Sequence, residues 1–168
     1  MTVRVLITGV SGVGKSTIVE TLRARGIEAL DLDAPPYSEE IVVDEDEVTG
    51  LGPGRDWVWR TDLVRDVLES ASGEAVFLSG CSPNQRDFYD RFDHVVLLSA
   101  PPGVIAERLA TRTNNRFGKR QGELERALAI QQEIEPLLRS GADTHVDTTA
   151  PVEQVVRTIL TAVGLDRR

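Results

Sequence analysis

The hydrophobic residues of this chain follow two different spacings that alternate along its length. Short apolar runs lie at residues 3–7, 27–30, 75–78 and 95–98, with a weaker one at 144–147. Runs of this length, bounded by glycine, proline or charged residues, are typical of buried β-strands. Between them, apolar residues recur every three or four positions, as on one face of an α-helix. Five strands that alternate with helices predict an α/β fold, in which helices cover both faces of a parallel sheet.

Two segments show neither spacing. Residues 34–54 are rich in proline and acidic side chains, and we expect them to be irregular or partly helical. Residues 113–120 combine basic side chains with asparagine and glycine, which predicts a loop before a long helix over residues 124–138. There is no internal repeat or linker, so residues 1–168 are expected to form a single domain.

Composition and charge argue against several classes of protein. Lysine and arginine total 19 against 27 aspartates and glutamates, and the resulting net charge of −8 disfavours a nucleic-acid partner. No apolar stretch approaches the roughly 18 residues of a membrane helix, so we expect no membrane partner. The absence of a signal-peptide pattern and the single cysteine favour the cytoplasm. The oligomeric state is not indicated.

Residues 9–16 read Gly-Val-Ser-Gly-Val-Gly-Lys-Ser, which is the full GxxxxGK[ST] pattern of a phosphate-binding loop between a strand and a helix. In such a loop successive backbone N–H groups surround the phosphates, and the following helix contributes its positive N-terminal end. We therefore predict that ATP and Mg²⁺ are bound by Gly9, Ser11, Gly12, Val13, Gly14, Lys15, Ser16 and Thr17. Lys15 would reach the β- and γ-phosphates, Ser16 would bind the metal and Thr17 would contact the α-phosphate.

Other motifs narrow the kind of phosphate-loop protein. The chain lacks the [NT]KxD motif that reads guanine in GTPases and the LSGGQ motif of transporter ATPases. It is also short for a ring-forming ATPase with a helical lid domain. A kinase that phosphorylates a small-molecule hydroxyl is the leading interpretation, with two alternatives: a nucleotide kinase that acts on a phosphate oxygen, and an ATP-binding regulator or ATPase without a separate acceptor.

Nearly the whole chain resembles the shikimate and gluconate kinase group of the nucleoside-monophosphate-kinase-like P-loop fold. The resemblance rests on the phosphate loop, Leu-Asp-Leu-Asp at residues 30–33, the arginine-rich loop and Val-Asp-Thr-Thr at residues 146–149. It implies a three-layer sandwich around a five-stranded parallel sheet. It also implies a lid loop at residues 112–122 and an acceptor-side segment at residues 34–56.

The same resemblance assigns roles to two carboxylates after the second strand. Asp31 would hold a magnesium-bound water, and Asp33 would hydrogen-bond the acceptor hydroxyl and take its proton. The alternative is that both are solvated turn residues or a helix cap. The third strand ends in Ser79-Gly80 without the aspartate that many P-loop proteins use for magnesium. Because of this departure, Asp31 is the carboxylate that we expect at the magnesium site.

The sequence gives only part of the information needed to identify the phosphoryl acceptor. Cys81-Ser82 echoes the gluconate kinases, whereas the triple-glycine acceptor motif of shikimate kinases is absent, which argues against shikimate. Cys81 either packs in the core or contributes to the acceptor site. Trp57 and Trp59 either belong to the core beside the start of a helix or line the acceptor pocket. Six acids lie within residues 39–47. If this segment closes over the substrate instead of only facing solvent, it favours a neutral or cationic acceptor.

The lid and the adenine site complete the resemblance. Arg112 would stack on adenine and Arg116 would contact the transferred phosphate, where an arginine fork neutralises developing charge. Thr148 and Pro151 lie where related kinases pack the adenine edge. A solvated basic loop and an ordinary strand-to-helix turn are the respective alternatives.

Overall fold

A computed structural model of the chain describes residues 1–47, 49–113 and 116–166. The elements follow in the order β1 (Val3–Thr8), α1 (Lys15–Ala24), β2 (Glu28–Asp31), β3 (Ser38–Val42), β4 (Arg55–Trp59), α2 (Thr61–Ser70), β5 (Ala75–Ser79), the 3-10 helix η1 (Gln85–Arg91), β6 (His94–Ser99), α3 (Pro102–Thr111), α4 (Gln121–Gly141), β7 (Thr144–Asp147) and α5 (Val152–Ala162). The five strands of the main sheet match the five predicted runs to within one residue at each end.

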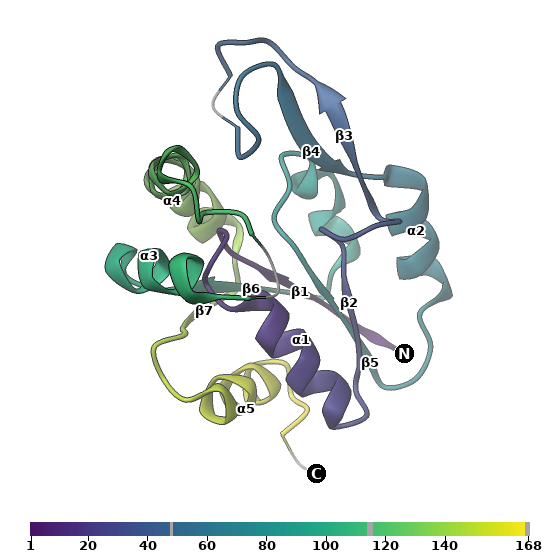
Figure 1. The fold of residues 1–168 in the computed structure, drawn as a ribbon. Helices are drawn as coiled ribbons and strands as arrows, with labels where there is room; N and C mark the ends of the chain where they lie inside the picture. Colours follow the sequence, from purple (N-terminus) through teal and green to yellow (C-terminus); the bar gives the residue numbers. More distant parts are fainter. Residues whose placement is uncertain (48, 114–115, 167–168) are drawn as a thin grey trace.

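The main sheet has the strand order β2-β5-β1-β6-β7, and all of its neighbouring pairs are parallel (Figure 1). The predicted α/β fold with a five-stranded parallel sheet is therefore confirmed. The carboxyl ends of all five strands meet at one edge, where open parallel sheets bind their ligands. β1 is the central strand, so the loop that follows it leaves the sheet at the middle of this edge.

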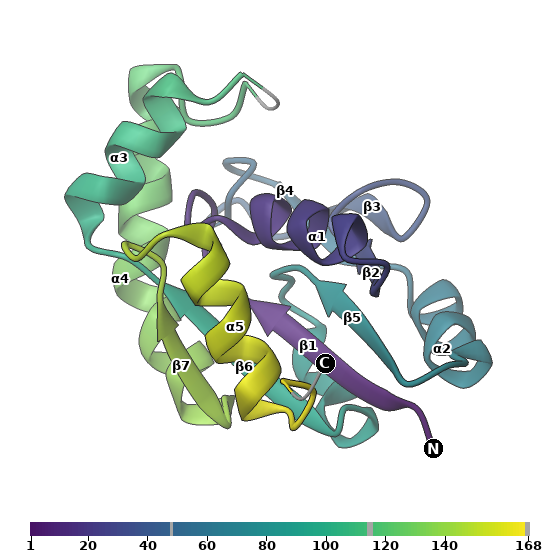
Figure 2. The ribbon, with the colours of Figure 1, turned by 90° about the horizontal axis from the view of Figure 1, so that it is seen from below.

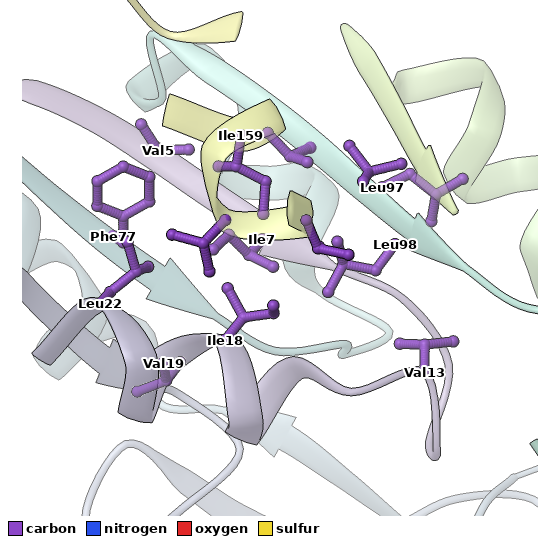
Figure 3. Close-up of a cluster of buried hydrophobic side chains, with 14 of the residues drawn as sticks. Val5, Ile7, Val13, Ile18, Val19, Leu22, Phe77, Leu97, Leu98 and Ile159 are labelled. Carbon is purple, nitrogen blue, oxygen red and sulfur yellow. The ribbon is translucent and has the colours of Figure 1, made fainter. Parts of the chain in front are cut away.

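Helices cover both faces of the sheet. α1 and α5 lie side by side over one face, as Figure 2 shows. Their apolar residues pack against apolar residues of the strands, and Figure 3 shows Leu22, Phe77 and Ile159 within this cluster. α2 and η1 cover the opposite face. Full burial of a side chain of this size contributes roughly 1.5–3 kcal/mol, so the two clusters hold the edge that carries the site.

A second sheet, the antiparallel hairpin of β3 and β4, stands above the carboxyl edge of the main sheet (Figure 1). The expectation that residues 34–54 are irregular or partly helical was wrong for β3. Consecutive acids at Glu39 and Glu40 hide the alternation of a strand, and the pairing partner lies beyond a long loop. At the base of the hairpin Trp59 is only 1% exposed and its ring lies 6.0 Å from that of Phe88, so this tryptophan belongs to the core.

Among the described residues, no helix is both long and apolar enough to cross a lipid bilayer. In the same part of the chain, no group of three or more histidine, cysteine, aspartate or glutamate side chains is placed to hold a metal ion.

Candidate nucleotide and phosphoryl-transfer site

The loop after β1 has the backbone geometry that the glycine pattern predicts. Gly12 and Gly14 adopt φ angles of 89° and 107°, a region that residues with a Cβ rarely occupy. Gly14 is also the N-cap of α1, so the loop passes directly into the first turn of the helix. The loop is thus curled around the positive end of α1, which is the arrangement that binds phosphate in this motif.

Lys15 lies folded back over its own loop. Its Nζ donates hydrogen bonds to the carbonyl oxygens of Gly9 and Val10, the latter at 3.2 Å. A phosphate group would compete with these carbonyl oxygens for the ammonium group. Gly9 has a separate packing role, because a Cβ at this position would lie 2.6 Å from the carbonyl oxygen of Leu98.

A cavity of about 600 Å³ opens over this loop, a volume within the range of small-molecule sites. Its lining consists of Ser11, Gly12, Val13, Gly14, Lys15, Ser16, Thr17, Ile18, Asp31, Asp33, Ala34, Arg108, Thr111, Arg112, Thr148, Ala150, Val152 and Val155. The cavity therefore brings together the phosphate loop, the end of β2, α3 and the turn between β7 and α5. These segments are distant in sequence and meet because all of them lie at the carboxyl edge of the sheet.

Three predicted site residues lie outside the lining of this cavity. Gly9 begins the loop directly after β1, Pro151 is the exposed N-cap of α5, and Arg116 is exposed on the loop before α4. Of the predicted lid at residues 112–122, Asn114 and Asn115 fall outside the described residues. The roles expected for these residues toward a nucleotide stay predictions.

Asp31 and Asp33 occupy the end of β2, at the edge of the cavity. Oδ1 of Asp31 accepts a hydrogen bond from the backbone N–H of Asp33 at 2.9 Å, which fixes the turn after the strand. Asp31 also lies opposite Ser79 in the register of β2 with β5. Ser79 is 1% exposed, and no hydrogen-bond partner is found for its Oγ among the described residues. Where many P-loop proteins carry an aspartate, β5 of this chain ends in a buried hydroxyl opposite Asp31.

Asp33 is held by donors from two other segments. Its Oδ1 accepts a hydrogen bond from Nε1 of Trp59 at 2.9 Å, and its Oδ2 accepts one from the backbone N–H of Cys81 at 3.0 Å. The indole of Trp57 donates to the backbone oxygen of Asp33 at 3.0 Å. The hairpin therefore positions this carboxylate, and the sequence alone did not connect the two tryptophans with it.

Burial raises the pKa of Asp33 above its usual value, although the charge of Lys15 and the bonds from Trp59 and Cys81 act in the opposite direction. A carboxylate with a raised pKa is a better proton acceptor than an exposed one. Its surroundings therefore suit a group that accepts a proton from a hydroxyl, with the lysine of the phosphate loop nearby.

Arg112 and Arg108 bring positive charge to the opposite side of the cavity. Nη2 of Arg112 donates to the backbone oxygen of Phe117 at 2.7 Å, and desolvation lowers the pKa of its guanidinium. Arg108 donates to the carbonyl oxygen of Val13 at 3.0 Å and to Thr148. Nothing local in the sequence indicates that Arg108 contacts residues this far along the chain.

Comparisons with known proteins agree with this architecture. The most similar curated relatives include a nucleotide-binding protein from Cellvibrio japonicus (strain Ueda107), which is 25% identical over 150 residues that cover 86% of this chain and 46% of that protein. The chain spans about half the length of the curated relatives it matches.

Solved structures match over almost the entire chain. A shikimate kinase from Acinetobacter baumannii in complex with shikimate has a TM-score of 0.64 at 16% identity, covering 99% of this chain and 96% of that chain. A gluconokinase from Sinorhizobium meliloti 1021 has a TM-score of 0.55 at 24% identity, covering 96% and 91%. At these identities the likeness establishes the fold.

The fold and the loop together define a P-loop protein of the shikimate and gluconate kinase-like architecture, as the sequence resemblance predicts. Residues 5–131 match the model of the AAA domain family (AAA_18), and because this match covers most of the chain, the chain belongs to that family. A P-loop domain of this kind binds nucleotides. The matched residues contain the phosphate loop, Asp31, Asp33 and the start of α4.

Proposed function

We propose that this protein transfers the γ-phosphoryl group of ATP, with Mg²⁺, to a hydroxyl group of a small-molecule acceptor. The observation that carries the proposal is Asp33, a carboxylate with a raised pKa at the border of the nucleotide cavity and within the electrostatic reach of Lys15. A protein that only bound ATP would have no need of a second carboxylate beside Asp31 at the border of the cavity. The kinase folds among its structural neighbours support the same function.

In this proposal the chain supplies positioning and charge. Bound Mg²⁺ would neutralise phosphate charge, with Ser16 as its protein ligand and Asp31 holding one of its waters. Lys15 would exchange its two loop carbonyls for phosphate oxygens. Asp33 would orient the acceptor hydroxyl and take its proton, while Arg116 would approach the transferred group from the lid. Arg112, Thr148 and Pro151 would bind the adenine.

The acceptor in this proposal is a neutral or cationic compound. Residues 34–60 carry seven acids and two bases, Arg55 and Arg60. Arg55 lies 3.7 Å from Glu40, and Arg60 lies 3.4 Å from Asp62 at the start of α2. Arg86, the other arginine near the base of the hairpin, donates to α4 at Ser140. These arginines already have acceptors, so an anionic substrate would have to displace them.

The proposal places the activity in the cytoplasm, with neither nucleic acid nor a membrane as partner. The alternatives remain a nucleotide kinase and an ATP-binding regulator or ATPase. They differ in what stimulates ADP release: a phosphate-bearing acceptor for a nucleotide kinase, and no acceptor at all for a regulator.

The test is ADP release from ATP and Mg²⁺ across a panel of sugars, amino sugars, sugar acids, nucleosides, nucleotides and hydroxylated antibiotics. Lys15→Ala should abolish any stimulated release, and Arg157→Ala, an exposed arginine on α5, is the control for a surface substitution. Stimulation by hydroxyl compounds that disappears with Lys15 supports the proposal. ATP binding without stimulation by any acceptor would contradict it, and stimulation by nucleotides alone would replace it with the nucleotide kinase.

A further inference from the structure

Arg108 on α3 connects two segments of the nucleotide cavity that lie far apart in the sequence. Its Nη1 donates to the carbonyl oxygen of Val13 at 3.0 Å and to Oγ1 of Thr148 at 2.8 Å, and its Nη2 donates to the carbonyl oxygen of Thr148 at 2.6 Å. The hydroxyl of Thr148 in turn donates to the carbonyl oxygen of Val13 at 2.6 Å. The three residues form a closed ring of hydrogen bonds between the phosphate loop, α3 and the turn after β7.

Val13, the member of this ring that belongs to the phosphate loop, is well placed to fix the conformation of that loop. Val13 lies between Gly12 and Gly14, the two residues with φ angles of 89° and 107°. Its side chain is fully buried in the core, and its carbonyl oxygen accepts bonds from both Arg108 and Thr148. A peptide unit anchored on both sides fixes the curl of the loop, and with it the direction of the neighbouring N–H groups.

Arg108 also lines the nucleotide cavity. It is half-buried and lines the same space as the phosphate loop, and its Nη1 lies 3.8 Å from the position that a Cβ would take on Gly14. The bonds that it makes need a planar fork of donors, because they run from two nitrogens to acceptors on two different residues. A lysine carries the same charge but cannot reproduce that fork.

We propose that Arg108 is a positioning residue for the nucleotide, which clamps the phosphate loop to the turn between β7 and α5 and so preorganises the cavity before ATP binds. This inference rests only on the nucleotide-binding part of the proposed function. In this inference Arg108 affects nucleotide affinity through its bonds to Val13 and Thr148, in addition to the effect of its positive charge. Hydrogen bonds from a charged donor are worth about 1.5–3 kcal/mol, so loss of the ring should cost roughly 10- to 100-fold in nucleotide affinity.

The experiment measures the Kd of ATP with Mg²⁺ by calorimetry for the full chain and for Arg108→Lys, Thr148→Val and the double variant, with Arg157→Ala as a matched arginine control. We expect Arg108→Lys to weaken binding by about 10-fold or more. Thr148→Val should weaken it less, because Arg108 keeps its bonds to the carbonyl oxygens of Val13 and Thr148. The double variant should be little weaker than Arg108→Lys, because both changes act on one ring. Arg157→Ala should bind as the unaltered protein does.

A second readout separates a clamp from general destabilisation. Hydrogen exchange of residues 9–16 without nucleotide should accelerate in Arg108→Lys, while exchange in β5 and β6 stays unchanged. Affinity retained in Arg108→Lys would show that charge alone matters and would overturn the proposal, as would additive effects or unchanged exchange of the loop. If the unaltered protein failed to bind ATP, both this inference and the proposed function would fail. If the Arg108→Lys variant bound ATP and transferred phosphate as the unaltered protein does, only this inference would fail.

Discussion

Replacing Trp59 with phenylalanine tests how the hairpin controls the acidity of Asp33. The substitution keeps most of the buried ring and removes the Nε1–H that donates to Oδ1 of Asp33 at 2.9 Å. That bond favours the charged carboxylate, because a hydrogen bond to a charged group is worth about 1.5–3 kcal/mol against about 0.5–1.5 kcal/mol for a neutral pair. The difference, about 1–1.5 kcal/mol, corresponds to about one pKa unit. The pKa of Asp33, already raised by burial, should therefore rise further by about this amount.

The direct assay is a titration of the aspartate side-chain carboxyl carbons by NMR, with Asp33→Asn to identify the resonance. Trp57→Phe is the matched control, since its indole donates to the backbone oxygen of Asp33 at 3.0 Å and not to the carboxylate. This variant should leave the pKa of Asp33 nearly unchanged. In a transfer assay, the loss of activity on the acid side should move to higher pH in Trp59→Phe. A pKa that stays constant or falls in Trp59→Phe would refute the role given to this bond.

Three further predictions concern the same edge of the sheet. Gly80→Ala should destabilise the fold by about 1–3 kcal/mol, because its Cβ would lie 2.6 Å from Oδ1 of Asp33 and 2.8 Å from Cζ2 of Trp59; urea unfolding measures this, and unchanged stability would contradict it. Lys15→Ala should abolish transfer while its melting temperature changes little, and residual turnover would show that another group neutralises the phosphate. Because the folded state holds its proton on Asp33 to a higher pH than the unfolded state, the free energy of unfolding should fall as pH rises from about 4 through the raised pKa. Asp33→Asn should remove this part of the pH dependence, and identical pH profiles for the two proteins would argue against the raised pKa.

Local signals carried most of what could be predicted about the fold. The phosphate loop is defined by glycines and a lysine within eight consecutive residues, and the buried strands are short continuous apolar runs. Neither depends on distant parts of the chain. The hairpin was missed because its pairing joins Val42 to Arg55 across a long loop, and its strands mix charged and apolar residues on both sides.

The candidate site was predictable to the extent that its residues follow strand ends. Asp31 and Asp33 could be placed at the edge of the sheet from the run that precedes them. The donors to Asp33 could not, because Trp59 and Cys81 approach it from 26 and 48 residues away in the sequence. The ring around Arg108 spans still larger separations, up to 135 residues between Val13 and Thr148. Side-chain contacts of this kind follow from packing, which periodicity does not encode.

The half-buried position of Cys81 has a practical consequence for labelling. Desolvation raises the pKa of its thiol to about 11, so at neutral pH only roughly one molecule in 10⁴ carries the reactive thiolate. Because this is the sole cysteine of the chain, an alkylating reagent should modify the folded protein slowly and at a single atom. The rate of that modification reports how accessible this thiol is in the segment after β5, without the need to introduce a probe. A slower modification in the presence of a small molecule would show that the molecule covers this thiol.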